Sequence, residues 1–338
     1  MHRPALSIVV PCYNEAATLP VLHQRVSAAA KAAVGDDHEI IFINDGSRDA
    51  SWPIMQQLAS ADPRVAAINL SRNHGHQLAL TAGLDLCSGE QILIIDADLQ
   101  DPPELVTEMR ATMAREGADV VFAVRRKRAG ETLFKKATAA AFYRVLDRLT
   151  DTPIPLDTGD FRLMTRRALD ALLALPEQAR FIRGMVAWIG FRQVPFPYDR
   201  AERHAGETNY PLSRMLRLAF DAVTGFSTAP LRFASHASVA LAGASLLLLV
   251  YILWGYFEGD PVQGWTSTML VVTVLSAVQM FVLGMIGEYI GRLYIESKRR
   301  PLYLVADIAG TVHSRATLGF QAAATRVREA DLVDDTRA

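Results

Sequence analysis

The sequence is poor in cysteine, and it has no excess of charge of either sign. Its 338 residues include only two cysteines, Cys12 and Cys87, which have no paired spacing and lie in apolar sequence contexts. This argues against a disulfide-stapled fold and predicts reduced, structural thiols in the cytosol. The formal net charge of −1 gives no basic field that would attract a polyanion, so nucleic acid is not an expected partner.

We do not expect a secretory signal in the N-terminal residues. The only apolar run there, "LSIVV" before Pro11, is too short for the hydrophobic region of a signal peptide. We expect this run to form the first strand of the fold. The chain length leaves room for one large or two ordinary domains.

Hydrophobic residues, 50% of the chain, are concentrated in two long runs. Ala237 to Phe257 contains 21 uncharged residues and Thr268 to Gly287 contains another 20. Each run matches the roughly 20 residues with which a helix crosses a hydrocarbon core of about 30 Å. A buried core helix is the alternative interpretation, but core helices usually keep a polar face. We therefore predict two transmembrane helices, at about residues 237–257 and 268–290.

Basic residues flank this region but are absent inside it. No Lys or Arg occurs from Phe233 to Gly291, and the loop between the two runs, "EGDPVQG", is acidic. By the positive-inside rule, both ends of the region face the cytoplasm and the loop faces out. We expect a multi-pass hairpin in the inner membrane, with both termini cytoplasmic. The flanking basic residues are Arg214, Arg217, Arg232, Arg292, Lys298, Arg299 and Arg300.

Strand and helix signals alternate over the first 200 residues. Apolar runs such as "ALSIVVP", "HEIIFINDG", "RVAAINLS", "QILIIDAD" and "DVVFAVR" are separated by helical stretches. This repetition predicts an α/β fold with a Rossmann-type, mostly parallel sheet and helices on both faces. Because ligands of open α/β sheets bind at the carboxyl ends of the strands, we predict a nucleotide site there. The polar residues at the predicted strand ends are Asn14, Glu15, Asp45, Asp96, Asp98 and Arg125.

Two further segments have an amphipathic helical pattern. Pro211 to Thr224 keeps Arg214 and Arg217 off its apolar stripe and immediately precedes the first transmembrane run, which favours a helix lying in the membrane interface. For Leu133 to Leu149, packing onto the sheet is an equal alternative. The predicted organisation is a cytosolic catalytic domain (1–208), an interfacial amphipathic helix (209–235), the hairpin (236–293) and a cytosolic tail (294–338).

The stretch "IIDADLQDPPEL" places two aspartates and a glutamine after a strand predicted over Ile92 to Ile95. On an extended segment alternate residues point the same way, so Asp96, Asp98 and Gln100 can share one face. Three oxygen donors with open positions suit Mg²⁺ or Mn²⁺, which also take substrate phosphates as ligands. A helix cap is the alternative role. Asp101 alone can cap the helix that "DPPEL" begins, which favours a metal role for the others.

The other polar strand ends and the nearby histidines are less specific. Glu15 precedes a helix and Asp45 lies in the turn "NDGS". Each carboxylate can accept hydrogen bonds from a base or a ribose, or can simply complete a turn. His74 and His76 flank Gly75, but no third ligand lies nearby in the sequence. We interpret both as loop histidines rather than as a metal site.

Six motifs, in order "VVPCYNE", "NDGS", "SRNHGHQLAL", "DADLQDPPE", "DTGDFRLM" and "AGETNYP", resemble the family 2 glycosyltransferases. More narrowly, they resemble the polyprenyl-phosphate glycosyltransferases with two C-terminal transmembrane helices, over about Leu6 to Val305. The resemblance implies a GT-A-like fold. It also implies an inverting, metal-dependent transfer of one sugar from a nucleotide-diphosphate sugar, with UDP-glucose favoured, to polyprenyl (undecaprenyl) phosphate. UDP-N-acetylglucosamine, GDP-mannose and a modified arabinose donor remain open.

The resemblance also implies roles for individual residues. The implied nucleotide contacts are Pro11, Tyr13, Glu15, Asp45, Asp96, Arg125 and Lys135. The implied ligands of Mg²⁺ or Mn²⁺ are Asp96, Asp98 and Gln100. The implied catalytic residues are Asp157, Asp98 and Arg203. The expected contacts of the acceptor phosphate are Arg200, Arg203, Arg214 and Arg217. Asn209 stands where the family often has Lys, which shifts the expected phosphate contact towards Arg203.

The implied partners are the nucleotide sugar, the polyprenyl phosphate and the membrane. A downstream flippase and a lipid-sugar-using glycosyltransferase would act in the same pathway, and a homo-oligomer is compatible with this function. Three other functions compete. A processive synthase would carry more transmembrane helices and a Gln-x-x-Arg-Trp motif, which "QARF" does not match. A flippase would need intramembrane polar residues along a path. A non-catalytic scaffold would be expected to have lost the acids at the strand ends.

Overall fold

The computed structural model describes residues 3–125, 158–199, 229–258 and 264–311. The chain divides into two compact units. The sheet unit comprises Met1–Lys136, Ile154–Asn209 and Pro301–Ala338, and the helix unit comprises Ala137–Pro153 and Tyr210–Arg300. The predicted interfacial helix over 211–224 and the amphipathic segment over 133–149 lie outside the described residues.

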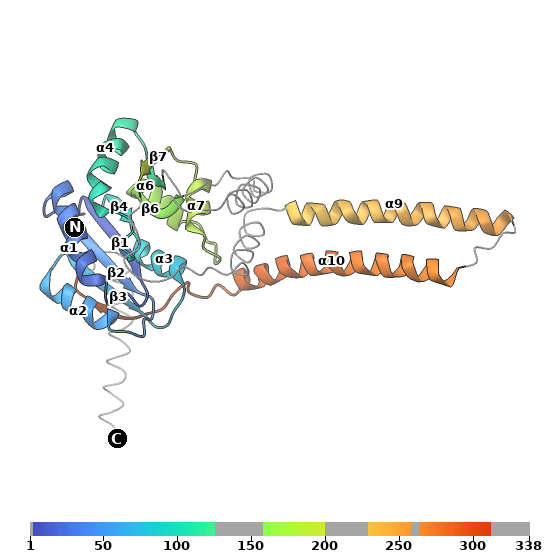
Figure 1. The fold of residues 1–338 in the computed structure, drawn as a ribbon, viewed down its shortest axis with the longest axis horizontal. Coiled ribbons are helices and arrows are strands. Elements are labelled where there is room, and N and C mark those ends of the chain that lie inside the picture. Colours follow the sequence, from blue (N-terminus) through green and yellow to red (C-terminus); the bar gives the residue numbers. More distant parts are fainter. Residues whose placement is uncertain (1–2, 126–157, 200–228, 259–263, 312–338) are drawn as a thin grey trace, which may run out of the picture. The chain divides into compact units, whose positions relative to one another are not determined.

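The sheet unit is built on an eight-stranded sheet with the order β7-β5-β6-β4-β1-β2-β3-β8 (Figure 1). Strand β1 pairs in parallel with β2 and β4, β2 with β3, and β5 with β7. Strand β6 is antiparallel to β4 and β5, and β8 is antiparallel to β3. The mostly parallel α/β sheet is therefore confirmed. The strands are β1 (Leu6–Cys12), β2 (His38–Asn44), β3 (Val65–Leu70), β4 (Gln91–Ile94), β5 (Val120–Arg125), β6 (Thr158–Thr165), β7 (Gln193–Tyr198) and β8 (Val305–Ala309).

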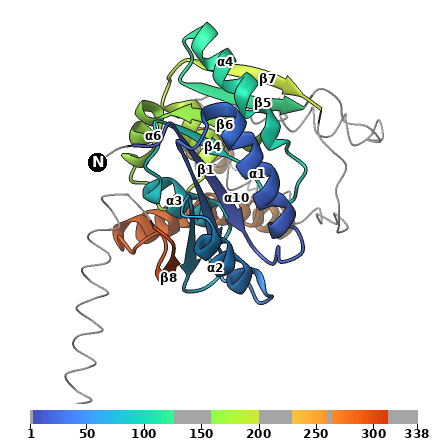
Figure 2. The same ribbon diagram turned by 90° about the vertical axis from the view of Figure 1, so that its left-hand side faces the viewer.

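Helices cover both faces of this sheet, as predicted (Figures 1 and 2). Helices α1, α2 and α4 pack their apolar side chains into one core with alternate residues of β1 and β2. Helix α3 packs on the opposite face, and α6 lies beside it against β4 and β6. The helices are α1 (Leu19–Val34), α2 (Ser51–Ala61), α3 (His76–Leu86), the 3₁₀ turn η1 (Pro103–Leu105), α4 (Val106–Glu116), α6 (Arg166–Leu173) and α7 (Ile182–Trp188).

The central strands are buried along their whole length because helices cover both of their faces. Every residue of β1 and β2 is buried, the pattern expected of parallel strands between two helical layers. The approach of α3 is close enough to require a glycine. A Cβ on Gly83 would come within 2.4 Å of Val9 Cγ1 and 2.5 Å of Ile43 Cδ1. This close packing fixes the N-terminal end of α3 at the edge where the strands end.

The segment after β4 differs from its prediction in two ways. The strand ends at Ile94, and Leu99 has a left-handed backbone with φ of 60°. The aspartates therefore lie in a turn, and the extended, alternating geometry predicted for them is wrong. Asp101 is not a helix cap either, since η1 begins after Pro102 without a side-chain cap. Instead Asp101 is buried and accepts a 2.5 Å hydrogen bond from the Tyr198 hydroxyl.

The two cysteines behave as predicted. Cys12 and Cys87 are buried and form no disulfide. Burial raises the pKa of both thiols, that of Cys87 to about 12. Both are therefore held protonated at neutral pH, as expected of structural thiols.

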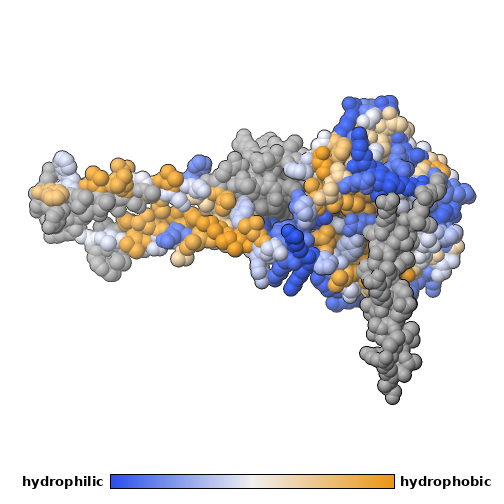
Figure 3. Space-filling view, turned by 180° about the vertical axis from the view of Figure 1, so that it is seen from behind, coloured by the Kyte–Doolittle hydropathy of each residue, from blue (hydrophilic) through white to orange (hydrophobic). Residues whose placement is uncertain are grey.

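The helix unit contains two long helices, α9 (Ala229–Glu258) and α10 (Trp265–Ser297), which contact each other. They include the two runs predicted to cross a membrane. In the part of the chain that the structure describes, one segment, Val274–Ser297, is long and apolar enough to do so by length and composition. Figure 3 shows apolar side chains along the described parts of both helices. The helical hairpin is thus present, and its insertion as two transmembrane helices remains a prediction.

Candidate active site

The carboxyl ends of the central strands bring the predicted polar residues to one edge of the sheet. The parallel register aligns Cys12 with Asn44 and Val9 with Ile94. The segments that follow β1 and β2 therefore begin side by side, and the segment after β4 begins three residues earlier along β1. Each of the three segments carries an acidic residue. Tyr13, which follows β1, is 43% exposed and thus accessible from solvent. This edge is the candidate active site.

The loop after β1 is tied to the loop after β2. Asn14, in a left-handed conformation with φ of 57°, donates its backbone N–H to Ser47 Oγ at 2.9 Å and accepts from Arg48 N at 2.8 Å. The Glu15 backbone N–H donates to Ser51 Oγ at 2.9 Å. The strained Asn14 backbone is thus held by contacts on both sides, which fixes the positions of its two neighbours in the chain.

Asp45 joins the β2 turn to the loop before α3. Its two carboxylate oxygens accept backbone N–H groups of His74 at 2.7 Å and of Gly75 at 2.9 Å. Burial raises the pKa of Asp45, and these two hydrogen bonds oppose the rise. Beside it, a Cβ on Gly46 would lie 2.5 Å from the Arg72 backbone. Asp45 therefore completes a turn, which is one of the two roles predicted for it. Its contact with a nucleotide remains a prediction.

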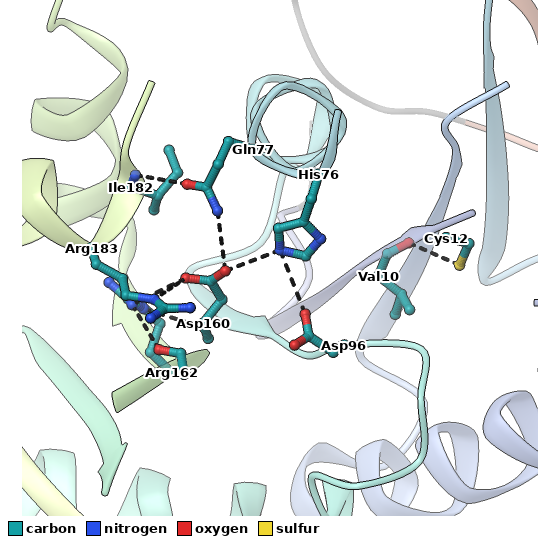
Figure 4. Close-up of polar contacts among 10 residues, drawn as sticks. Val10, Cys12, His76, Gln77, Asp96, Asp160, Arg162, Ile182 and Arg183 are labelled. Atoms are coloured by element: carbon teal, nitrogen blue, oxygen red, sulfur yellow. Dashed lines mark hydrogen bonds and ion pairs between the residues drawn. The ribbon is translucent and has the colours of Figure 1, made fainter. Parts of the chain in front are cut away.

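The structure brings three side chains together that the sequence analysis had separated. His76 Nε2 lies 3.0 Å from Asp160 Oδ2 and 3.6 Å from Asp96 Oδ1 (Figure 4). Ligand atoms of the three residues lie within 4.8 Å of one another, close enough to hold a metal ion. The interpretation of His76 as a loop histidine without a nearby partner is therefore wrong. His74, by contrast, lies in the loop before α3, and its Nε2 lies 3.5 Å from Ser71 Oγ.

Asp160 is the most heavily coordinated carboxylate of the site. It is 3% exposed and accepts hydrogen bonds from His76 Nε2 at 3.0 Å, Gln77 Nε2 at 3.2 Å and Arg183 Nε at 3.0 Å. The buried Arg162 guanidinium lies 3.6 Å from its Oδ1. Burial would raise the pKa of Asp160, but the His76 hydrogen bond and the two arginines hold it well below its usual range. Asp160 is thus ionised.

Asp96 is the opposite case, a carboxylate with too few partners. Its Oδ1 is buried and has no hydrogen-bond partner among the described residues. Burial raises the pKa of Asp96 to about 6, helped by the charges of Asp160, Asp101 and Asp98 and opposed by His76. A bound divalent cation would remove this penalty, because it prefers carboxylate oxygens and favours their charged form. The carboxylates of this turn therefore suit Mg²⁺ or Mn²⁺.

Asp98 and Gln100 complete the turn. Asp98 Oδ1 accepts the Gln100 backbone N–H at 3.1 Å across the left-handed Leu99. Both side chains are partly exposed at the same edge as Asp96. The backbone turn thus holds Asp98 and Gln100 next to Asp96, and the binding of a metal ion by these three side chains remains a prediction.

Comparison with known proteins identifies the family. Residues 7–173 match the family model described as glycosyl transferase family 2, and residues 229–293 match that of the GtrB C-terminal hairpin. The glycosyltransferase YkcC of Bacillus subtilis (strain 168), described as uncharacterized, is 47% identical over 91% of this chain and 95% of its own. The chain belongs to glycosyl transferase family 2.

Relatives with a more specific name match nearly as much of the glycosyltransferase. A bactoprenol glucosyl transferase of Shigella phage SfV is 38% identical over 89% of this chain and 98% of its own. A prophage bactoprenol glucosyl transferase homolog of Escherichia coli (strain K12) is 36% identical over 90% and 99%, respectively. The predicted family, the GT-A-like fold and the enzymatic nature of the protein are confirmed. The non-catalytic scaffold is excluded as its function.

Several predicted site residues fall in parts of the chain that the structure leaves undescribed. Two other predicted nucleotide contacts are described: Arg125 is the last residue of β5, and Pro11 lies in β1. The predicted residues outside the described ranges are Lys135, Asp157, Arg200, Arg203, Arg214 and Arg217. The sequence analysis in turn missed the residues around Asp160. The only signal for them was "TGDFRLM", in which two charges alternate with apolar residues on a buried strand.

Proposed function

We propose that this glycosyltransferase transfers one sugar from a nucleotide-diphosphate sugar, with UDP-glucose favoured, to polyprenyl phosphate at the cytoplasmic face of the membrane. The observation that carries the proposal is the buried Oδ1 of Asp96, which has no hydrogen-bond partner among the described residues and lies close to Asp98 after the end of a central strand. The relatives named bactoprenol glucosyl transferase and the matching hairpin support a lipid-linked acceptor.

In this proposal Asp96, Asp98 and Gln100 would hold Mg²⁺ or Mn²⁺. When bound, the ion would supply positive charge against the negative charge that develops on the departing nucleotide diphosphate. The nucleotide would lie along the loops after β1 and β2, where Tyr13 is exposed and Asp45 fixes the loop before α3. Pro11 and Glu15 would complete its base and ribose contacts, and Arg125 and Lys135 would contact the phosphates.

The transfer itself requires little acid–base chemistry. An oxygen of the acceptor phosphate attacks the anomeric carbon from the face opposite the nucleotide, the bond to the diphosphate breaks, and the configuration inverts. A phosphate with a second pKa of about 6 is mostly deprotonated at neutral pH, so a strong general base is not needed. Asp157 would orient the acceptor or accept its remaining proton.

The acceptor phosphate and the nucleotide diphosphate are both anions, so basic side chains near the membrane are needed to offset their repulsion. Each Lys or Arg close to an anionic bilayer surface contributes about 1 kcal/mol of attraction. Arg200, Arg203, Arg214 and Arg217 would contact the acceptor phosphate and offset the repulsion. The helices α9 and α10 would cross the bilayer as a hairpin. A prenyl tail stays in the hydrocarbon core, so the active site would have to work at the headgroup plane.

Transfer assays with variants test the proposal. The detergent-purified protein is supplied with labelled UDP-glucose, undecaprenyl phosphate and Mn²⁺, and we expect one sugar per lipid. Asp98→Asn should lower the rate by about 100- to 1,000-fold, the range seen when an electrostatic contact to developing charge is lost. Asp36→Asn is the matched control, because Asp36 is 76% exposed and precedes β2 at the opposite edge of the sheet.

The outcomes separate the parts of the proposal. Full activity of Asp98→Asn with a chelator present would eliminate the metal. A polymer in place of a single sugar would indicate a processive synthase. Parallel reactions with UDP-N-acetylglucosamine, GDP-mannose and a modified arabinose donor would identify the sugar. Failure of all four donors with the lipid would eliminate polyprenyl phosphate as the acceptor.

A further inference from the structure

Asp160 connects three elements that are far apart in the sequence. His76 and Gln77 come from the start of α3, Arg183 comes from the start of α7, and Asp160 itself lies in β6. Gln77 also accepts the Ile182 backbone N–H at 2.9 Å with its Oε1, so its amide orientation is fixed at both ends. The carboxylate of Asp160 is therefore a rigid anchor for the His76 ring (Figure 4).

The hydrogen bond to Asp160 determines where the proton of His76 lies. An ionised carboxylate only accepts hydrogen bonds, so His76 Nε2 must carry the hydrogen that it donates over 3.0 Å. A nitrogen that carries a hydrogen has no lone pair for a metal ion. Asp160 also faces two guanidinium groups already, those of Arg162 and Arg183. The three clustered side chains are thus better suited to a hydrogen-bonded chain than to a metal site of their own.

The same N–H faces the unpartnered oxygen of Asp96. His76 Nε2 lies 3.6 Å from Asp96 Oδ1, which is too long for a hydrogen bond but within ion-pair range. This contact favours one orientation of the carboxylate and leaves the lone pairs of Oδ1 available. Without it, that buried oxygen would have neither a hydrogen bond nor an ion pair among the described residues.

We propose that His76, fixed by Asp160, is a positioning residue that orients the Asp96 carboxylate towards the divalent cation of the active site. This inference rests on the proposed function, in which Asp96 and Asp98 bind that ion. Residues that orient metal ligands typically change metal affinity by about 10- to 100-fold when they are replaced. The chain of contacts here runs from Asp160 to His76 to Asp96, so a second carboxylate lies between the histidine and the ion.

The test compares side chains at position 76 by their ability to donate. Glutamine places an N–H group at nearly the reach of Nε2, whereas alanine places none there. We expect His76→Ala to weaken Mn²⁺ binding by about 10- to 100-fold and His76→Gln to restore most of it. Mn²⁺ affinity in the presence of UDP is measured on the full-length protein in detergent by the electron paramagnetic resonance signal of the free ion. Thermal unfolding midpoints verify that the variants fold.

His74→Ala is the matched control, since it removes a histidine ring two residues earlier that contacts Ser71, and it keeps the backbone N–H that Asp45 accepts. If His76→Ala does not fold, His76→Asn replaces it. Its amide is too short to reach the Nε2 position, so the same weakening is expected.

Unchanged Mn²⁺ affinity in His76→Ala, with affinity lost in Asp98→Asn, would overturn the positioning role and leave the metal site intact. Equal loss in His76→Ala and His76→Gln, with unchanged unfolding midpoints, would also overturn it and would indicate that the imidazole binds the ion directly. Undiminished affinity in Asp98→Asn would count against the proposed metal site itself, which is a separate result.

Discussion

In the sheet unit the apolar side chains of the central strands are buried, whereas in the helix unit many of the described apolar side chains of α9 and α10 are exposed. Leu6 and Ile8 of β1 are 0% exposed, while Leu247 of α9 is 73% exposed and Phe281 of α10 is 57% exposed. A water-soluble surface rarely shows contiguous apolar area of this kind. The sheet unit therefore provides apolar surroundings for its own side chains, whereas in the proposed hairpin a bilayer would provide them for the helix unit.

The largest expected difference is between two leucines. Leu6→Ala should lower the free energy of unfolding by about 2–5 kcal/mol, because it leaves a cavity in a closed core. Leu247→Ala should change it by no more than about 0.5 kcal/mol, as is usual for exposed positions. Chemical denaturation of the detergent-purified variants measures both. Equal losses would show that Leu247 is packed as tightly as a core residue.

A charge at Leu247 distinguishes lipid from water as the surroundings of α9. In a membrane, Leu247→Arg should cost about 2.5–3.5 kcal/mol of insertion free energy. In water the same change would be harmless. The fraction of the chain that stays in membranes after alkaline extraction reports the effect. Leu304→Arg is the control, since Leu304 is 51% exposed on the sheet unit. Complete retention of Leu247→Arg would argue against a membrane-spanning α9.

How much the sequence predicts also differs between parts of the molecule. The parallel strands β1 to β4 were predictable, because apolar runs alternate with amphipathic helices and the polar residues follow each run directly. Strand β6 was not, since nothing local indicates that it pairs antiparallel between β4 and β5. That pairing is what brings Asp160 to His76, 84 residues away. The left-handed Leu99 was likewise unpredictable, because its conformation depends on the surrounding turn and not on its own preference.

Two glycine substitutions, one in each unit, should change the stability by less than the leucine substitutions but differ in the same direction. Gly83→Ala should cost about 1–3 kcal/mol, the usual range for overpacking, because the new methyl group would collide with Val9 and Ile43. Gly243 in α9 has nothing within 4 Å of the position of a Cβ. Gly243→Ala should therefore be neutral or stabilise the helix by up to about 1 kcal/mol. Thermal unfolding in detergent compares the two, and a tolerated Gly83→Ala would show that α3 can move off the sheet.

Acidification should destabilise the sheet unit through two histidines, the partly buried His23 and the buried His38. Burial lowers the pKa of His23, despite the opposing charge of Asp62, and also that of His38, whose Nδ1 donates to Gly35 O at 2.8 Å. A histidine with a lowered folded-state pKa contributes stability that is present above its unfolded pKa of about 6.5 and is lost as pH falls below it.

The thermal unfolding midpoint should accordingly decrease as the pH is lowered from about 7 to about 5, the range in which an unperturbed histidine takes up its proton. His38→Asn keeps a donor near the Nδ1 position but cannot titrate, so it should reduce this dependence on pH. An unchanged slope in His38→Asn would assign the effect to His23 or to other groups.

The smallest expected effect comes from surface ion pairs, and it tests the contrast through salt. Arg25 Nε and Nη2 each donate to Glu104 at 2.9 Å in the sheet unit, where both side chains are at least 33% exposed. A double-mutant cycle should give a coupling of about 0.2–1 kcal/mol that falls as salt is added, because water surrounds the pair.

In α10, Arg292 lies 3.2 Å from Glu288, one helical turn earlier. Such a pair contributes about 0.2–0.5 kcal/mol on a helix in water. If the proposed hairpin places it at the bilayer boundary, dissolved ions reach it less easily, and its coupling should depend less on salt. Equal salt dependence of the two couplings would place this end of α10 in open water, and the hairpin would then have to end before Glu288.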